Sequence, residues 1–150
     1  MKQNLNFYEK FYLILFNSIS RTNKSIPEWS TTISISIILF MNLFSVIILL
    51  NISDLKGLGD GVFQFGMLII MIFHWFYFLK RNRILKKLKR VKHQITNSER
   101  IISGIYCLSS ISLVYYVLGM GMELYLITLG AFTILFFLVH EFGGKPIEYN

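Results

Sequence analysis

The chain has 150 residues, of which 54% are hydrophobic and only 15% are charged, and its mean hydropathy is +0.56. A soluble domain carries about 25% charged residues, so this composition argues against a soluble domain and excludes intrinsic disorder, a collagen-like repeat and a disulfide scaffold. The formal net charge of +7 accompanies an excess of apolar residues that predicts an all-α integral membrane protein.

Residues 1–25 are predicted to form an amphipathic helix in the cytoplasmic membrane interface. Its apolar stripe has helical spacing and consists of Leu5, Tyr8, Tyr12, Leu15 and Ile19. The polar side holds Asn6, Lys10, Asn17 and Ser20. Packing of this helix against the remaining helices is an equally good interpretation. A cleaved signal peptide fits less well, because Glu9 interrupts the basic region and no small-residue cleavage site follows.

Four windows that are almost free of charged residues follow, at 29–53, 61–79, 101–122 and 124–142. A helix that crosses a hydrocarbon core needs roughly 17 to 25 such residues. Backbone groups in lipid have to be paired internally, and none of the windows alternates like a barrel strand, so each window predicts an α-helix. Residues 26–142 are therefore expected to form a bundle of four transmembrane helices.

Capping and turn residues mark the ends of these helices. Ser25 and Glu28 are spaced as a capping box before the first span, and Thr96 and Glu99 repeat the pattern before the third. Residues 118–122 contain two glycines and are predicted to turn the chain between spans three and four, which then form a tight antiparallel hairpin. Gly143, Gly144 and Pro146 are the expected stop after the fourth span.

The basic residues are distributed very unevenly. The leader at 1–28, the connector at 80–100 and the tail at 143–150 together hold 14 of the 15 Lys and Arg residues. The positive-inside rule then places both termini and the connector in the cytoplasm of a multipass cell-membrane protein. No Gly or Pro separates the second span from the connector, so that span is expected to continue as a basic helical extension.

Eight basic residues of the connector are candidates for contact with anionic lipid or with a cytoplasmic protein partner. They are Lys80, Arg81, Arg83, Lys86, Lys87, Lys89, Arg90 and Lys92. The simpler interpretation is a topology determinant with a solvated basic face. Nucleic acid is not an expected partner, because the run contains no base-stacking aromatic residue and the chain has no reader module.

A few polar residues within the spans suggest a polar pathway, whose candidates are Ser34, Asn42, Ser45, Gln64 and His74. In this interpretation His74 is the titrating group. Packing between helices explains the same residues more simply, because Ser, Thr and Asn form hydrogen bonds across helices.

The sequence predicts no catalytic, metal or cofactor site, and hence no enzyme. His140 and Glu141 begin a zinc-protease motif, but Gly144 replaces the second histidine. The single cysteine, Cys107, lies within the third span and is interpreted as a small apolar residue.

The function that these features favour is a homo-oligomeric channel or membrane-permeabilising effector. The alternative is a non-conducting membrane anchor or accessory subunit that recruits a cytoplasmic partner or anionic lipid through the basic connector. An intramembrane enzyme fits the sequence least well.

Overall fold

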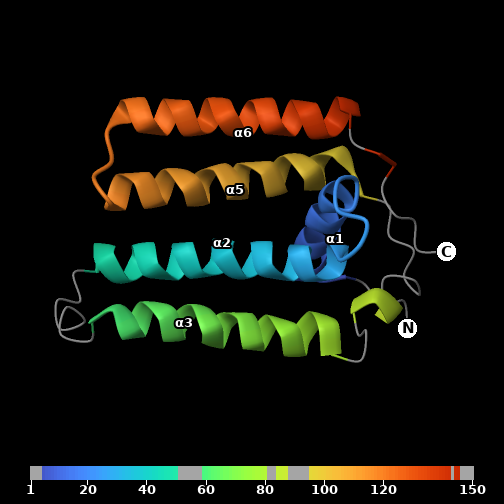
Figure 1. Cartoon of the computed structure of the whole chain (residues 1–150), viewed down its shortest axis with the longest axis horizontal. Coiled ribbons are helices and arrows are strands. Elements are labelled where there is room, and N and C mark those ends of the chain that lie inside the picture. The colour runs from blue at the N-terminus through green and yellow to red at the C-terminus, as the bar shows by residue number, and fades with distance from the viewer. Residues whose placement is uncertain (1–4, 51–58, 81–83, 88–94, 143, 146–150) are drawn as a thin grey trace.

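A computed structural model describes residues 5–50, 59–80, 84–87, 95–142 and 144–145, and every regular element in these ranges is helical. The elements are α1 (Phe7–Ile19), α2 (Pro27–Leu49), α3 (Gly59–His74), the π-helix η2 (Trp75–Leu79), α5 (Asn97–Val117) and α6 (Met122–Phe142) (Figure 1). One more helical turn covers residues 84–87. The predicted all-α class is confirmed, and all four charge-poor windows are largely helical.

The four long helices lie side by side in a single layer, in the order α3, α2, α5, α6 (Figure 1). α2 packs against α3 on one side and against α5 on the other, so the described helices form an open layer and not a closed bundle (Figure 1). A bundle closes when each helix presents one apolar stripe to a common centre. Each of these helices also carries large exposed apolar side chains, so no single stripe selects such a centre. The number of membrane spans stays a prediction.

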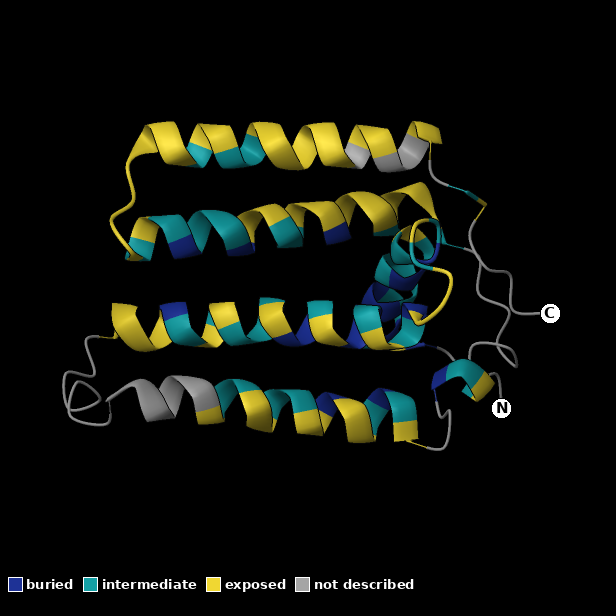
Figure 2. Cartoon of the chain, in the orientation of Figure 1, coloured by how far each residue is buried: buried dark blue, intermediate teal, exposed yellow. Residues whose placement is uncertain are grey.

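Large apolar side chains remain exposed on every helix of the layer (Figure 2). Examples are Phe65 on α3, Ile105 on α5 and Ile127 on α6, each more than half exposed. α2 and α5 are each long and apolar enough to cross a membrane. Extended exposed apolar surface is typical of contact with lipid or with another protein.

The packed core lies at one end of the layer, where α1 crosses it (Figure 2). Its buried apolar residues are Leu5, Phe11, Tyr12, Phe16, Ile35, Phe78 and Ile84. The Tyr12 ring stacks on Phe78 with centroids 4.4 Å apart, and Phe11 meets Tyr106 edge-on at 5.3 Å. α1 is therefore packed on the other helices, which was one of the two interpretations of its sequence. Of its predicted stripe, Leu5 and Tyr12 are fully buried and the rest half-buried.

Two of the helix starts differ from expectation. The Ser25–Glu28 capping box is wrong, because the N-cap of α2 is Ile26 and no side chain caps it. Asn23 organises this turn instead, since its Oδ1 accepts a hydrogen bond from Ile26 N at 3.2 Å and its Nδ2 donates to Ser30 Oγ at 2.7 Å. An unpredicted capping box forms at the start of α1, between Asn6 and Glu9.

The predicted Thr96–Glu99 capping box at the start of α5 is confirmed. The turn between α5 and α6 is also in its predicted place, and Gly119 adopts a φ of 62° there. α5 and α6 are antiparallel, but their described side-chain hydrogen bonds lie near the turn, from Ser112 to Tyr125 at 2.7 Å and from Tyr115 to Thr128. The hairpin is thus less tight than predicted.

The expected continuation of the second span into the connector is wrong. The π-helix ends at Leu79, and Lys80 leaves the helical conformation with φ −55° and ψ 121°. The next described turn, at 84–87, inserts Ile84 into the core beside α1. Burial of that side chain, together with the ion pair from Lys87 to Glu9, stabilises a connector that folds back onto α1.

Candidate functional site

A chain of buried polar side chains lies where α1 crosses α2 and the end of α3. The Ser36 hydroxyl donates to the carbonyl oxygen of Thr32 at 2.8 Å and also lies 2.7 Å from His74 Nδ1. The tautomer of His74 decides whether the hydroxyl or Nδ1 is the donor of this contact. Its other ring nitrogen, Nε2, is hydrogen-bonded to the Tyr8 hydroxyl. Both Ser36 and His74 have no exposed surface.

Aromatic rings enclose this polar chain. The rings of Tyr8, Phe73 and Phe78 lie with centroids 5.7, 5.7 and 5.8 Å from that of His74. Burial, followed by the neighbouring phenols of Tyr106 and Tyr77, raises the pKa of Tyr8. Burial also raises the pKa of Tyr12. The two phenols of α1 are therefore held neutral, as donors or acceptors of hydrogen bonds.

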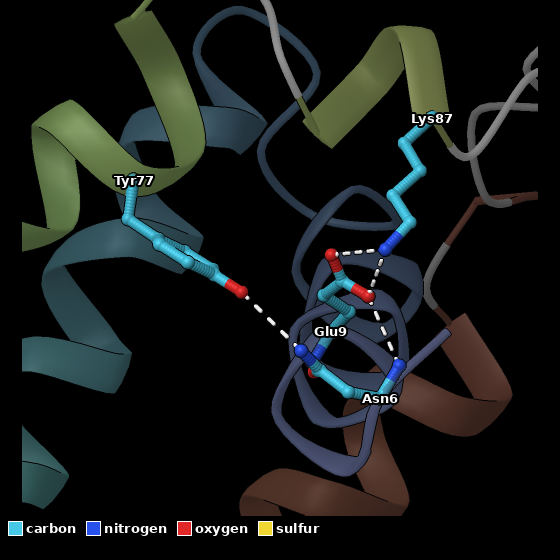
Figure 3. A network of polar contacts seen from close by, with 4 residues as sticks. All are labelled: Asn6, Glu9, Tyr77 and Lys87. Atoms are coloured by element: carbon cyan, nitrogen blue, oxygen red, sulfur yellow. Dashed lines mark hydrogen bonds and ion pairs between the residues drawn. The ribbon is translucent and has the colours of Figure 1, made fainter. Parts of the chain in front are cut away.

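A second polar cluster joins α1 to the connector (Figure 3). Both carboxylate oxygens of Glu9 lie 2.6 Å from Lys87 Nζ. One of them also accepts from the backbone N–H of Asn6 at 3.0 Å, and the Asn6 amide donates to the Tyr77 hydroxyl at 3.3 Å. The Glu9 side chain is only 8% exposed and that of Lys87 28%. Removing either partner from such a pair leaves a poorly solvated charge, so this ion pair, here called the clasp, fixes the connector to α1.

Lys10, which follows Glu9 on α1, forms an ion pair with Glu99 at the start of α5. Lys10 Nζ lies 2.8 Å from Glu99 Oε1, and their side chains are 35% and 18% exposed. Exposed pairs of this kind contribute about 0–1 kcal/mol. α1 is thereby linked by charge to two separate elements, the connector through Glu9 and α5 through Lys10.

The described candidates for the polar pathway make separate contacts. Ser34 donates to the Ser30 carbonyl oxygen of its own helix at 2.9 Å, and Asn42 donates to the Tyr106 hydroxyl on α5 at 2.8 Å. His74 belongs to the polar chain with Ser36. Ser45 is fully buried, and its Oγ has no hydrogen-bond partner. The side chain of Gln64 lies outside the described part of the structure.

Three of the eight basic candidates of the connector are described. Lys80 is exposed, and its Nζ lies 4.3 Å from the centroid of the Phe76 ring, within cation–π range. Lys86 is exposed, and Lys87 forms the clasp with Glu9. The other five lie outside the described residues, namely Arg81, Arg83, Lys89, Arg90 and Lys92.

Sequence reasoning missed Tyr8 as a polar partner, Ser36, and Glu9 as the partner of the connector. The Asn6–Glu9 spacing of a capping box was available as a signal for the start of α1. Glu9 is the one acidic residue among the basic residues of 1–25, and this was a second signal. Nothing in the sequence pairs Ser36 with His74, because their contact depends on how two apolar helices rotate against each other.

No group of three potential metal ligands occurs among the described residues. Cys107 is half-buried and its thiol is free. A shallow groove of about 450 Å³ runs along α5, lined by Ile105, Leu108, Ser109, Ser112, Leu113 and Tyr116. Its lining is mainly apolar, which suits a hydrocarbon chain or an apolar helix better than a polar substrate.

The described polar groups thus connect helices to one another: Ser36, His74 and Tyr8 connect α2, α3 and α1, and the clasp connects α1 to the connector. Comparison with known proteins finds no matching family, no matching curated relative and no matching solved structure.

Proposed function

We propose that this chain is a four-span protein of the cell membrane, with both termini in the cytoplasm, that serves as a non-conducting anchor or accessory subunit. It holds a small cytoplasmic platform, made of α1 and the connector, at the membrane surface. Anionic lipid headgroups or an acidic cytoplasmic protein are the partners that this basic platform suits.

The observation that carries this proposal is the position of the packed core. The buried apolar cluster and both polar clusters lie at the α1 end, whereas the rest of the layer consists of apolar helices with exposed sides. Packing is expected where geometry has to be kept, so the part of the molecule with a defined shape is the platform together with the ends of α2 and α3 and with η2, on which the platform packs.

Two further features support a membrane setting. α2 and α5 satisfy the length and hydropathy requirements for a span, and α3 with η2 continues in helical conformation from Gly59 to Leu79. Trp29 and Trp75 are both partly exposed, at the ends of their helices nearest α1 and the connector. Tryptophan is enriched at membrane–water interfaces, so these residues suit a headgroup region at that end of the layer.

Charge reversal tests the anchoring role. We expect replacement of Lys86, Lys87, Lys89 and Arg90 by Glu to abolish co-purification of a stoichiometric partner from the native membrane. Lys56→Glu is the matched control, because Lys56 is the one basic residue outside the leader, the connector and the tail, which the positive-inside rule assigns to the opposite side. Its recovery of the partner should equal that of the unmodified chain. Equal recovery with the fourfold variant would contradict recruitment through the connector.

A homo-oligomeric channel is the second candidate. A layer one helix thick can line a larger ring of copies, and Ser45 offers a buried hydroxyl without a partner in a single copy. Ion flux into liposomes that contain only this protein separates the two candidates. Tight vesicles across pH and voltage are expected for an anchor, and reproducible flux that is lost in Ser45→Leu would instead support the channel.

A further inference from the structure

We infer that Arg21, Lys24 and Lys145 form a docking surface for the phosphate groups of anionic lipids, at the point where the leader meets the tail. This surface, here called the basic corner, belongs neither to α1 nor to the connector. The inference rests on the membrane setting proposed above, but it does not depend on recruitment of a partner through the connector.

A backbone contact joins the leader to the tail at this corner. The N–H of Gly144 donates to the carbonyl oxygen of Arg21 at 3.2 Å. A Cβ added to Gly144 would lie 3.1 Å from Lys24 Nζ, so the tail passes beside that ammonium group, and Lys145 is the next residue. The fold thus brings a basic residue of the tail to two of the leader, at the end of the layer where α2 begins and α6 ends (Figure 1).

The turn between α1 and α2 holds the two basic residues of the leader on a fixed backbone. The N–H of Asn23 donates to the carbonyl oxygen of Ile19 at 2.8 Å, and Asn23 Nδ2 donates to Ser30 Oγ at 2.7 Å. The backbone positions of Arg21 and Lys24 therefore do not depend on a ligand. Only their side chains have to be ordered when an anion binds, which keeps the entropic cost of binding small.

No described carboxylate forms an ion pair with the basic corner. The two described ion pairs use Lys10 and Lys87 instead. In the corner, Lys24 and Lys145 are exposed and Arg21 is half-buried. Like charges that are held together repel each other, and a bound anion relieves this repulsion. Phosphate suits the corner, because Arg and Lys are the usual protein ligands of phosphate oxygens.

Two exposed apolar side chains next to the corner favour a lipid over a soluble anion. Ile26 is 54% exposed, and Trp29 in the first turn of α2 is 47% exposed. Tryptophan is enriched at membrane–water interfaces, and apolar side chains beside basic ones are typical of segments that lie in an anionic interface. A lipid offers a phosphate to the basic residues and an acyl chain to Ile26 and Trp29, whereas free phosphate offers only the first.

Tryptophan quenching in the Trp75→Phe variant of the full chain tests this inference, because Trp29 is then its only tryptophan. Nanodiscs of phosphatidylcholine receive the same mole fraction of brominated phosphatidylglycerol or of brominated phosphatidylcholine. The quenching of Trp29 by each gives the relative association constant of the two lipids beside the corner. We expect phosphatidylglycerol to be favoured at least about fivefold, which is the effect of one basic residue near an anionic surface.

Removal of the three charges should remove this preference. Replacement of all three residues of the basic corner by Gln is expected to make the two brominated lipids equally effective. The matched control replaces Lys89, Arg90 and Lys92 by Gln, which removes the same number of charges from the connector, and it should keep the preference. If the triple variant of the corner does not fold, Lys145→Gln alone decides, because this exposed residue follows the last helix and its replacement should lower the preference severalfold.

Equal quenching by the two brominated lipids before any charge is removed would overturn the inference, and so would an equal loss of the preference in the connector control. Loss of the preference when inorganic phosphate is added at constant ionic strength would assign the corner to free phosphate and overturn its assignment to lipid. Absence of quenching by either lipid would contradict the membrane setting itself, whereas equal quenching contradicts this inference alone.

Discussion

Three serines of α2 show how position decides what a hydroxyl contributes. Ser34 and Ser36 both donate to the carbonyl oxygen four residues earlier in the chain, but Ser36 also meets His74. Ser45 is as buried as Ser36, yet its Oγ has no partner. The same residue type on the same helix is therefore expected to have very different effects when it is truncated.

Ser36→Ala should destabilise the protein by about 1–3 kcal/mol, because it leaves His74 Nδ1 buried without its hydrogen-bond partner. Ser45→Ala is the matched control and should be neutral or slightly stabilising, since it removes a buried polar atom that has no hydrogen bond to lose. Unfolding in mixed detergent, followed by circular dichroism, measures both changes. Equal destabilisation by the two variants would contradict the assigned hydrogen bond.

The two ion pairs of α1 differ in burial and should differ in strength. A double-mutant cycle on Glu9 and Lys87, with alanine at each position, should give a coupling free energy of about 1–2 kcal/mol, because Glu9 is poorly solvated. The same cycle on Lys10 and Glu99 should stay below about 1 kcal/mol. A larger coupling for the second pair would show that the clasp does not fix the connector.

At the scale of elements, α1 is a short helix that packs against several others. It begins with its own capping box, buries Phe11, Tyr12 and Phe16, and contacts α2, α5, η2 and the turn at 84–87. α6 is the opposite case, because most of its described side chains are exposed and its described side-chain hydrogen bonds to α5 lie near the turn. The chain thus carries one firmly packed short helix and one loosely packed long helix.

The turn that positions α6 depends on Gly119. Its φ of 62° lies in the left-handed region, so Gly119→Ala should cost about 1 kcal/mol. Gly121→Ala is the matched control, because neither glycine has an atom within 4 Å of an added Cβ and Gly121 has no such φ. Thermal unfolding distinguishes them, and an equal effect of the two substitutions would show that the turn conformation is not the cause.

The phenols of α1 predict an alkaline limit to the docking of α1 on the layer. Burial raises the pKa of both Tyr8 and Tyr12, so the undocked helix releases protons first as the pH rises above about 10, the ordinary tyrosine value. Docking stability is then present below pH 10 and lost above it. The protection of α1 from hydrogen exchange should fall there, and Tyr12→Phe should reduce the fall. An unchanged profile in that variant would exclude Tyr12 as a cause.

At the scale of the whole molecule, the sequence predicted the helices but not how they are arranged. The absence of charge over 20 or so residues is sufficient to locate an apolar helix, and Thr96 with Glu99 located the start of α5 correctly. The order of the helices in the layer depends on shape matching between surfaces that are mostly apolar. For the same reason the partners of His74 and Glu9, which lie 38 and 78 residues away in the chain, could not be predicted.

The proposed position of the layer in a bilayer can be tested by tryptophan fluorescence. Trp29 and Trp75 should both be quenched more strongly by lipids brominated near the headgroup than by lipids brominated near the chain end, because interfacial tryptophan lies at the headgroup level. Trp29→Phe and Trp75→Phe separate the two signals. Strong quenching at the chain end would contradict the proposed orientation of the layer.

A layer one helix thick has no buried central helix. In a bilayer, each of its long helices would touch acyl chains directly, so that hydrophobic mismatch would act on every one of them at once. Helices adjust to a thicker or thinner membrane by tilting. In such a layer the tilt would move the platform directly, because no central core separates the platform from the helices that contact lipid. In the proposed membrane setting, bilayer thickness would thus be a variable to which α1 and the turn at 84–87 are mechanically coupled.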